Sequence, residues 1–223
     1  DYSKSLNRVP VVIMAGGKGE RLKPFTNVLP KPLVPIDGIP IVEKIIDKFI
    51  HFGCNDFFLT INHMGNILKA YFENNKLEYS LSFIEEDMPL GTAGSLGLMS
   101  KKLDRSFILT NCDIIIKSNY EAFYNFHKDN DNLLTIVASA KEYVIPYGTC
   151  ELDKDGLLAK INEKPKYSHL VNTGMYILNP EVLKYIPPNK LYHITDLIEE
   201  IKNNGGKVGV YPIGSSSWVD IGQ

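Results

Sequence analysis

The chain has 223 residues, of which 44% are hydrophobic and 22% charged, and its formal net charge is −2. This composition is typical of a globular protein with one large core; it excludes a disordered or collagen-like chain and gives no support to a nucleic-acid partner. No apolar run approaches the roughly 18 to 20 residues that a membrane span needs, and the three cysteines form no C-x-x-C motif, so we expect a cytoplasmic protein with reduced cysteines.

Strands and helices alternate through the first half of the chain. A continuous apolar run predicts a buried strand over 9–14, which ends in a glycine turn. Apolar residues spaced i, i+3, i+4 and i+7 predict helices over 42–50 and 64–72. Further strands are expected at 57–61, 81–84 and 107–110, and a helical segment at 94–99. This alternation predicts an α/β domain with a Rossmann-like, mixed but mostly parallel sheet flanked by helices.

The second half is richer in strands, which are expected at 133–140, 172–178 and 208–212. Strands at 149–152 and 157–161 flank the turn signal Asp153-Lys154-Asp155-Gly156, which predicts a hairpin. A helix is expected at 194–201, with Asp196 and Glu199 placed as a capping box. We therefore expect a linker at 1–8 and one domain at 9–223, with a nucleotide-type part (9–132) and a smaller, hairpin-containing substrate lobe (133–223).

A glycine-rich loop follows the first predicted strand. Three glycines and three cations are interleaved in it: Gly16, Gly17, Lys18, Gly19, Arg21 and Lys23. Glycines let backbone N–H groups approach an anion closely, and the cations add charge-assisted hydrogen bonds. The loop has no Walker A ending, and the leucine at position 22 breaks the dinucleotide-binding fingerprint. With Lys31 framed by two prolines, it predicts a phosphate-binding loop of a different kind.

Seven motifs of this chain resemble, in order, those of the sugar-1-phosphate nucleotidyltransferase family. The first is the loop from Ala15 to Thr26 with the Pro30-Lys31-Pro32 that follows it. The others are Gly91-Thr92-Ala93-Gly94, Asp113 at a strand end, Tyr147-Gly148, Glu163-Lys164-Pro165, Asn172-Thr173-Gly174 and Trp218-Val219-Asp220. The series spans nearly the whole chain, and it is most similar to the mannose-1-phosphate guanylyltransferase-like branch.

The resemblance implies an enzyme that joins an NTP and a sugar 1-phosphate into an NDP-sugar and pyrophosphate, with Mg²⁺ as cofactor. The implied nucleotide-binding residues are Ala15, Gly16, Gly17, Gly19, Glu86, Gly91 and Thr92. The implied sugar-binding residues are Tyr147, Gly148, Glu163, Lys164, Asn172 and Thr173. Asp113 and Asp220 are implied to hold the metal. The implied catalytic residues are Arg21, Lys31, Asp113 and Lys164, with Lys164 at the sugar phosphate.

The residue inventory suits this reaction. The attacking group is a phosphate oxygen, which is already largely ionised near neutral pH, so no Ser, Cys or His nucleophile and no general base is required. The difficulty is the approach of two polyanions, which calls for lysines, an arginine, backbone N–H groups and a carboxylate-bound metal. The five histidines are scattered and show no ligand spacing.

In uridylyl and thymidylyl members of the family, the position that corresponds to residue 86 looks like Gln. Here it is Glu86. A carboxylate only accepts hydrogen bonds, and guanine presents two adjacent donors on its Watson–Crick edge, so Glu86 favours GTP; UTP or dTTP stays the alternative. The sugar is expected to be a hexose or hexosamine for bacterial surface glycans. The chain is compatible with a glucosamine-1-phosphate guanylyltransferase of legionaminic acid synthesis, which carries a regulatory domain before the part that corresponds to Asp1. A homo-oligomer is also compatible with the sequence.

Some residues depart from the family pattern. Glu20 replaces a usual Thr and would repel a triphosphate unless it points away, and Cys112 replaces a usual Gly before Asp113. Two other classes of protein are weighed against an enzyme of this family. A catalytically silent nucleotide-sugar-binding module would be expected to lack Arg21, Asp113 or Lys164, and a glycosyltransferase would be expected to carry Asp-x-Asp where this chain has Asn111-Cys112-Asp113.

Overall fold

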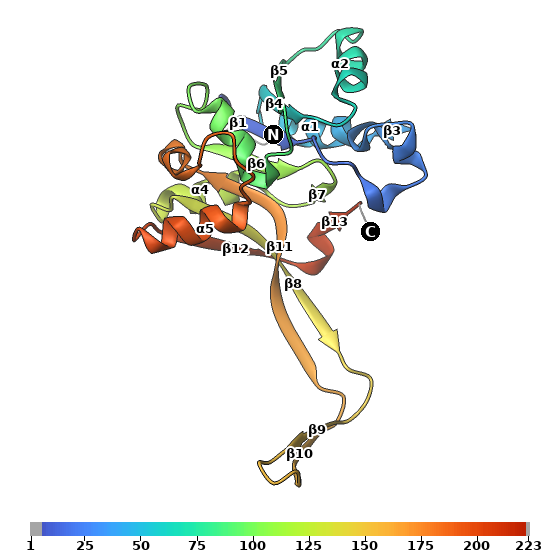
Figure 1. The fold of residues 1–223 in the computed structure, drawn as a ribbon, viewed down its shortest axis with the longest axis vertical. Coiled ribbons are helices and arrows are strands. Elements are labelled where there is room, and N and C mark those ends of the chain that lie inside the picture. The colour runs from blue at the N-terminus through green and yellow to red at the C-terminus, as the bar shows by residue number, and fades with distance from the viewer. Residues whose placement is uncertain (1–5, 222–223) are drawn as a thin grey trace.

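The computed structural model of the chain describes residues 6–221 and centres on one seven-stranded sheet, in the order β12-β8-β11-β6-β1-β4-β5 (Figure 1). Its strands are β1 (Pro10–Met14), β4 (Asp56–Ile61), β5 (Ser80–Glu85), β6 (Phe107–Asn111), β8 (Leu134–Val144), β11 (Lys166–Leu178) and β12 (Val208–Ile213). The strands expected from the sequence are confirmed, but β8 and β11 continue well beyond the predicted 133–140 and 172–178.

The strand directions place several carboxyl ends at one edge of the sheet. β6, β1, β4 and β5 run parallel, as do β8 and β12, whereas β11 runs antiparallel to both β6 and β8. The expected mixed, mostly parallel sheet is therefore confirmed. Because β11 reverses direction between β6 and β8, β8 leaves the sheet at the same edge as the carboxyl ends of β1, β4 and β6. Ligands bind beyond this edge in open α/β sheets.

Helices cover both faces of the sheet, which explains the uninterrupted apolar run in β1. Val11 and Ile13 pack with α1 (Ile41–His51), α2 (Gly65–Glu73) and α4 (Tyr120–Asp129). Val12 points to the opposite face and packs with α5 (Ile194–Asn203). Side chains alternate across a strand, so a strand covered on both faces is apolar at every position.

The helices at 42–50, 64–72 and 194–201 are confirmed, and the segment at 94–99 is a 3-10 helix (Ser95–Met99) that continues from α3 (Gly91–Gly94). Helix α5 does begin with a capping box, but His193 and Asp196 form it, and not the expected Asp196 and Glu199. The residue before the helix is His193, whose backbone N–H donates to the Asp196 carboxylate at 2.9 Å. Glu199 instead forms an ion pair with Lys202, one turn further on.

Helix α4 was not predicted from the sequence, although the chain carries its signals. Asn119 caps the helix, and its side-chain oxygen accepts hydrogen bonds from the N–H groups of residues 121 and 122. Tyr120, Phe123 and His127 have the i, i+3, i+7 spacing of a helical face, and all three are buried. Also absent from the prediction were β7 (Ile114–Ile116), β13 (Trp218–Asp220) and the two-residue pair β2 (Pro35–Ile36) and β3 (Ile39–Pro40).

The expected division of the domain at residue 132 does not correspond to a break in the sheet, because β8, β11 and β12 complete the same sheet. What stands apart is the segment 140–170, here called the arm (Figure 1). In it β8 and β11 run out of the sheet as a two-stranded ribbon that ends in a hairpin of β9 (Thr149–Leu152) and β10 (Leu158–Asn162). The expected hairpin is thus confirmed, but no side chain from 140 to 170 is buried.

The two ends of the described chain pack on the body. Leu6 is 1% exposed and its N–H donates to the carbonyl of Phe52, so the body begins within the expected linker; residues 1–5 lie outside the described residues. Near the other end, β13 pairs antiparallel with β7 and sets Asp220 beside Ile114. Among the described residues, no helix combines the length and the apolarity that crossing a membrane requires.

Candidate active site

The glycine-rich loop leaves β1 at the ligand-binding edge and is shaped by close contacts. Gly19 adopts φ +63°, and a Cβ atom there would lie 2.8 Å from the Thr26 methyl and 2.9 Å from Cβ of Lys31. The buried Thr26 hydroxyl donates to the Gly19 carbonyl at 2.8 Å. Only glycine therefore allows the loop to close on the short 3-10 helix Lys31–Leu33.

Two cations of this loop region converge on one carboxylate at the end of β6. The Lys31 ammonium donates a hydrogen bond to Asp113, and the Arg21 guanidinium lies 3.6 Å from the same oxygen. The Asp113 side chain is 6% exposed and that of Lys31 13%, whereas Arg21 is 61% exposed. The cluster has a net positive charge and one accessible member, Arg21, which suits the binding of phosphate.

Asp220 reaches the same place from the other end of the chain. Pairing of β13 with β7 brings it beside the residue that follows Asp113, and the Ile221 N–H donates to the Asp113 carbonyl at 2.8 Å. Both carboxylates line a pocket at the sheet edge. No three His, Cys, Asp or Glu side chains that could hold a metal gather in the described part of the chain. Mg²⁺ is commonly bound by one or two carboxylates together with substrate phosphates, so this donor pair fits that ion.

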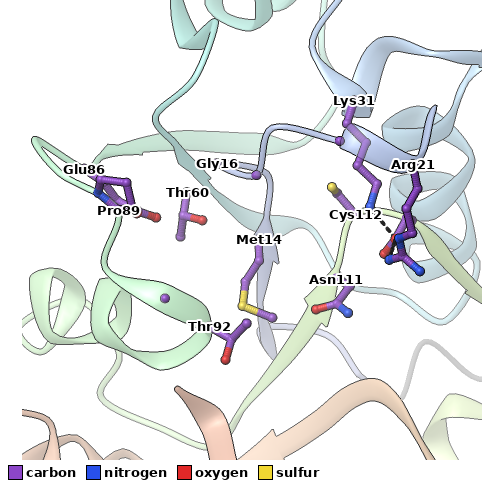
Figure 2. A pocket seen from close by; sticks show the side chains of 14 residues that line it. Met14, Gly16, Arg21, Lys31, Thr60, Glu86, Pro89, Thr92, Asn111 and Cys112 are labelled. Atoms are coloured by element: carbon purple, nitrogen blue, oxygen red, sulfur yellow. Dashed lines mark hydrogen bonds and ion pairs between the residues drawn. The ribbon is translucent and has the colours of Figure 1, made fainter. Parts of the chain in front are cut away.

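The cavity between these elements has a volume of about 320 Å³. Figure 2 shows Glu86 and Pro89 at one end, Lys31 and Arg21 at the other, and Gly16 and Thr60 between them. The residues that line it are Met14, Gly16, Gly17, Gly19, Arg21, Lys31, Thr60, Glu86, Pro89, Gly91, Thr92, Asn111, Cys112 and Asp113. Of the residues expected to bind nucleotide, six are among them. Ala15 is the exception, since its side chain is buried in the core under the loop.

Glu86 is held rigidly at its end of the cavity. Its carboxylate accepts a hydrogen bond from the Leu90 N–H at 3.2 Å, and its backbone carbonyl accepts one from the Asn62 amide at 2.6 Å. A Cβ atom at Gly16 would lie 3.3 Å from the carboxylate, so the loop backbone passes directly against it. Burial raises the pKa of Glu86, an effect opposed by the hydrogen bonds from Leu90 and Thr60.

The turn that contains Gly91 and Thr92 is fastened to the start of α5. The Tyr192 carbonyl accepts hydrogen bonds from the N–H groups of Ala93 and Gly94, and the Thr92 hydroxyl accepts one from the Ile194 N–H at 2.8 Å. Gly91 has φ +79°, and a Cβ there would lie 2.7 Å from the Tyr192 carbonyl oxygen. The Thr92 hydroxyl thus holds the turn that lines the cavity against the start of α5. The sequence motif did not reveal this role.

A second pocket adjoins the first at the base of the arm, and Arg21, Asn111 and Asp113 line both. Asn172 and Thr173 lie here, as expected for sugar-binding residues, but their polar atoms are engaged. The Asn172 amide donates to the Tyr176 hydroxyl at 2.7 Å, and the Thr173 hydroxyl donates to the Val137 carbonyl at 2.7 Å. These bonds hold the bulge between Asn172 and Met175 that interrupts the pairing of β11 with β8.

The other expected sugar-binding residues lie in the arm, just before β9 and just after β10. Tyr147 is 74% exposed, and Glu163 and Lys164 are exposed as well. Gly148 faces Glu163, because a Cβ at Gly148 would lie 3.1 Å from the Glu163 carboxylate. The structure therefore brings these four residues together where the ribbon meets the terminal hairpin of the arm, and none of them lines the cavity or the adjoining pocket (Figure 1).

Several cavity residues were not expected from the sequence: Met14, Thr60, Pro89, Asn111 and, as a wall residue, Cys112. Position at a strand end is the signal that could have found these residues, since Met14 and Asn111 are the last residues of β1 and β6 and Thr60 is the last but one of β4. Cys112 is buried, and burial raises the pKa of its thiol to about 12, so the group stays neutral. Glu20 is exposed and is not among the residues lining the cavity.

The loop and the cations around the cavity suit a phosphate-bearing ligand, and comparison with known proteins shows the family of this chain. The chain belongs to the nucleotidyl transferase family, whose model matches residues 10–223. It is 33% identical to the mannose-1-phosphate guanyltransferase of Pichia angusta over 95% of its own length and 60% of that protein. It is 28% identical to the UTP–glucose-1-phosphate uridylyltransferase of a Synechocystis strain, with the same coverage.

Among solved structures, HddC from Yersinia pseudotuberculosis in complex with GMP-PN is similar, with a TM-score of 0.74 and 26% identity. The match covers 96% of this chain and 94% of that one. The chain spans about 60% of the length of the curated relatives it matches. The expected family is thus confirmed, with relatives of the guanylyltransferase-like branch, while relatives named for other bases also match.

Proposed function

We propose that this chain transfers a nucleotidyl group from an NTP to a sugar 1-phosphate and releases pyrophosphate. The observation that carries the proposal is the two-ended cavity: Glu86 at one end can meet a base, and the glycine loop with Lys31 and Arg21 at the other can meet phosphates. A nucleotide extended along the sheet edge spans such a cavity. The adjoining pocket with Asn172 and Asp220 opens where the second substrate must approach.

In the proposed reaction, an oxygen of the sugar phosphate forms a bond to the α-phosphorus of the NTP while the bond to the pyrophosphate oxygen breaks. No proton must be removed from the attacking oxygen, so catalysis consists of positioning and charge stabilisation. The loop N–H groups, Lys31 and Arg21 hold the triphosphate and stabilise the departing pyrophosphate. Asp113 and Asp220 would hold Mg²⁺, which supplies charge neutralisation at the phosphates when bound.

GTP is the NTP that we propose. The Glu86 carboxylate has lone pairs beyond those used by the Leu90 N–H and the Thr60 hydroxyl, and it can accept from the adjacent N1–H and 2-amino groups of guanine. Uracil and thymine present one donor between two acceptors, which suits an amide better. The guanyltransferase relatives and the GMP-PN complex of HddC support this choice. For the second substrate we propose a hexose or hexosamine 1-phosphate, used in the cytoplasm for bacterial surface glycans.

The test is Mg²⁺-dependent pyrophosphate release with GTP, UTP, CTP and dTTP, each paired with a panel of hexose and hexosamine 1-phosphates. Arg21→Ala is expected to abolish most of the activity. Arg105→Ala is the matched control, since Arg105 is an exposed arginine paired with Asp104 and away from the cavity. Equal activity of Arg21→Ala and wild type would refute the proposed phosphate site, and binding of NTP without turnover on any sugar phosphate would favour a silent binding module.

A further inference from the structure

Asn111, the last residue of β6, lies where the two pockets of the site meet. Of the described residues, three line both the cavity and the adjoining pocket: Arg21, Asn111 and Asp113. Arg21 and Asp113 already have proposed partners in the phosphates and the metal, whereas no proposed step uses Asn111. Figure 2 shows Asn111 on the same side of the cavity as Arg21 and Cys112, and away from Glu86 at the end proposed for the base.

The fold does not use the side-chain amide of Asn111. Across the described range 6–221, no group of the chain forms a hydrogen bond with it, whereas the amide of Asn172 in the same pocket donates to the Tyr176 hydroxyl at 2.7 Å. The Asn111 side chain is half-buried. An amide that is partly removed from water is destabilising unless its donors and its acceptor find partners. A free, half-buried amide between two pockets therefore suits a polar ligand.

The space that this amide occupies is kept open at Gly174. β11 pairs antiparallel with β6 and sets Met175 opposite Thr110, so Gly174 lies opposite Asn111 just beyond the last pair. Gly174 has φ +87°, and a Cβ atom there would lie 2.9 Å from Cγ of Asn111. Any other residue at position 174 would therefore strain the backbone and also push the amide from its place.

A bulge in β11 brings Gly174 to this position. The pairing of β11 with β8 shifts register between Asn172 and Met175, and the Gly174 N–H donates to the Asn172 side-chain oxygen at 3.0 Å. The Met175 N–H donates to the Thr173 hydroxyl at 3.3 Å. Bulges are common beside active sites, where they change the direction of a side chain or end a pairing. Contacts within the chain thus fix the bulge whose glycine admits the Asn111 amide.

The boundary between the pockets is where the reacting phosphorus has to lie if each substrate occupies its own pocket. In the proposed reaction, the α-phosphoryl group leaves the pyrophosphate in the cavity and joins the second substrate in the adjoining pocket. Its non-bridging oxygens carry negative charge during the transfer, and donors placed beside them stabilise the transition state. Lys31 and Arg21 both contact Asp113, whereas the neutral amide of Asn111 offers two N–H donors that no carboxylate occupies.

We infer that Asn111 is a catalytic residue whose side-chain amide donates to the α-phosphoryl group during its transfer. The inference rests on the proposed function, because it assigns the cavity to the nucleotide and the adjoining pocket to the sugar phosphate. Gly174 is then a positioning residue, which acts only by leaving room for the amide of Asn111.

The kinetics of three variants test these roles. Asn111→Ala removes the amide, and kcat for pyrophosphate release is expected to fall about 10²-fold, while the Kd for GTP and the KM for the sugar 1-phosphate change less than about threefold. Gly174→Ala displaces the same amide and is expected to lower kcat to a similar extent. In the double variant Asn111→Ala/Gly174→Ala the new methyl group meets no amide, so kcat is expected to be no lower than in Asn111→Ala.

Three results would overturn the inference: a kcat of Asn111→Ala within about threefold of wild type, losses that multiply in the double variant, or a raised KM for the sugar phosphate with unchanged kcat. The last of these would place the amide at the sugar. The matched control is Asn204→Ala, at an exposed asparagine just after α5 whose amide donates to Glu200. This variant is expected to keep the kcat of the wild type.

Nuclear magnetic resonance tests the contact without turnover. The side-chain ¹⁵N–¹H signals of Asn111, assigned by their loss in Asn111→Ala, are expected to shift when GTP and Mg²⁺ bind, whereas those of Asn204 are not. Unshifted Asn111 signals in the GTP-bound protein would overturn the inference. If the wild type turns over no sugar 1-phosphate but the Asn111 signals shift, the proposed function fails and the contact with the nucleotide stands. A protein that binds no GTP would refute both.

Discussion

The cavity and the arm both carry charged residues, but those of the cavity are held by contacts within the fold and those of the arm are exposed. Around the cavity, Asp113 is buried, the glycine loop is closed by its own contacts, and Glu86 is held by hydrogen bonds on both its carboxylate and its carbonyl. On the arm, Glu163 and Lys164 are exposed on a ribbon without a core. The difference indicates that contacts within the chain hold the cavity residues proposed for the nucleotide in place, whereas the arm residues proposed for the sugar phosphate are exposed.

The largest effect is expected at the buried carboxylate. Asp113→Asn removes a proposed metal ligand and the charge that positions Lys31 and Arg21, and we expect kcat to fall by about 10²- to 10³-fold. Asp104→Asn, at an exposed aspartate away from the cavity, is expected to leave kcat unchanged. Steady-state pyrophosphate release measures both. A decrease in kcat of less than about threefold in Asp113→Asn would contradict a catalytic role for this residue.

Replacing one glycine of positive φ in each region by alanine shows how strongly each region contributes to the stability of the fold. Gly19→Ala forces a Cβ against Thr26 and Lys31, and we expect it to lower the free energy of unfolding by about 2 to 4 kcal/mol. Gly156, at φ +79° in the turn of the arm hairpin, has open space around it. Its replacement by Ala is expected to cost less than about 1 kcal/mol, because the strain is confined to a hairpin without a core. Urea unfolding of both variants measures the difference, and equal losses would contradict it.

The third prediction concerns the base. Glu86→Gln replaces an acceptor-only group with an amide, and we expect it to shift the ratio of kcat/KM for GTP over UTP about tenfold toward UTP. Glu85→Gln is the matched control, because the neighbouring carboxylate is exposed and pairs with Lys69 away from the cavity. An unchanged ratio in Glu86→Gln would mean that another group reads the base.

The smallest expected effect is a pH dependence at the same residue. Because burial raises the pKa of Glu86, its ionised form is disfavoured in the folded protein, and the residue opposes folding increasingly as the pH rises from the ordinary pKa of a glutamate to the raised one. The unfolding temperature of Glu86→Gln relative to wild type should therefore increase from pH 4.5 to pH 7. In the wild type, the affinity for GTP should fall on acidification, because the Glu86 carboxylate that accepts the hydrogen bonds of guanine becomes protonated. A constant difference in unfolding temperature would contradict the assigned shift.

Sequence patterns were most informative where a local signal is enough to define the element. The apolar run of β1, the periodicity of α1 and the turn before Gly156 predicted their elements, and strand-end position predicted Asp113. Long-range relations were beyond local patterns. No local signal shows that the Tyr192 carbonyl fastens the Gly91 turn, or that β8 and β11 continue past the sheet with exposed apolar side chains. The motif around Lys164 predicted chemistry for that residue, but only the fold shows that it stands apart from the cavity.

The most direct test of the two-region account is to measure GTP binding and sugar-phosphate use separately in Lys164→Ala, with the exposed arm residue Lys160 replaced by Ala as control. The account predicts an unchanged Kd for GTP by calorimetry and a KM for the sugar 1-phosphate raised about tenfold or more. A Kd for GTP weakened as much as the KM for the sugar phosphate, or a KM that does not change, would contradict the assignment of nucleotide to the cavity and sugar phosphate to the arm.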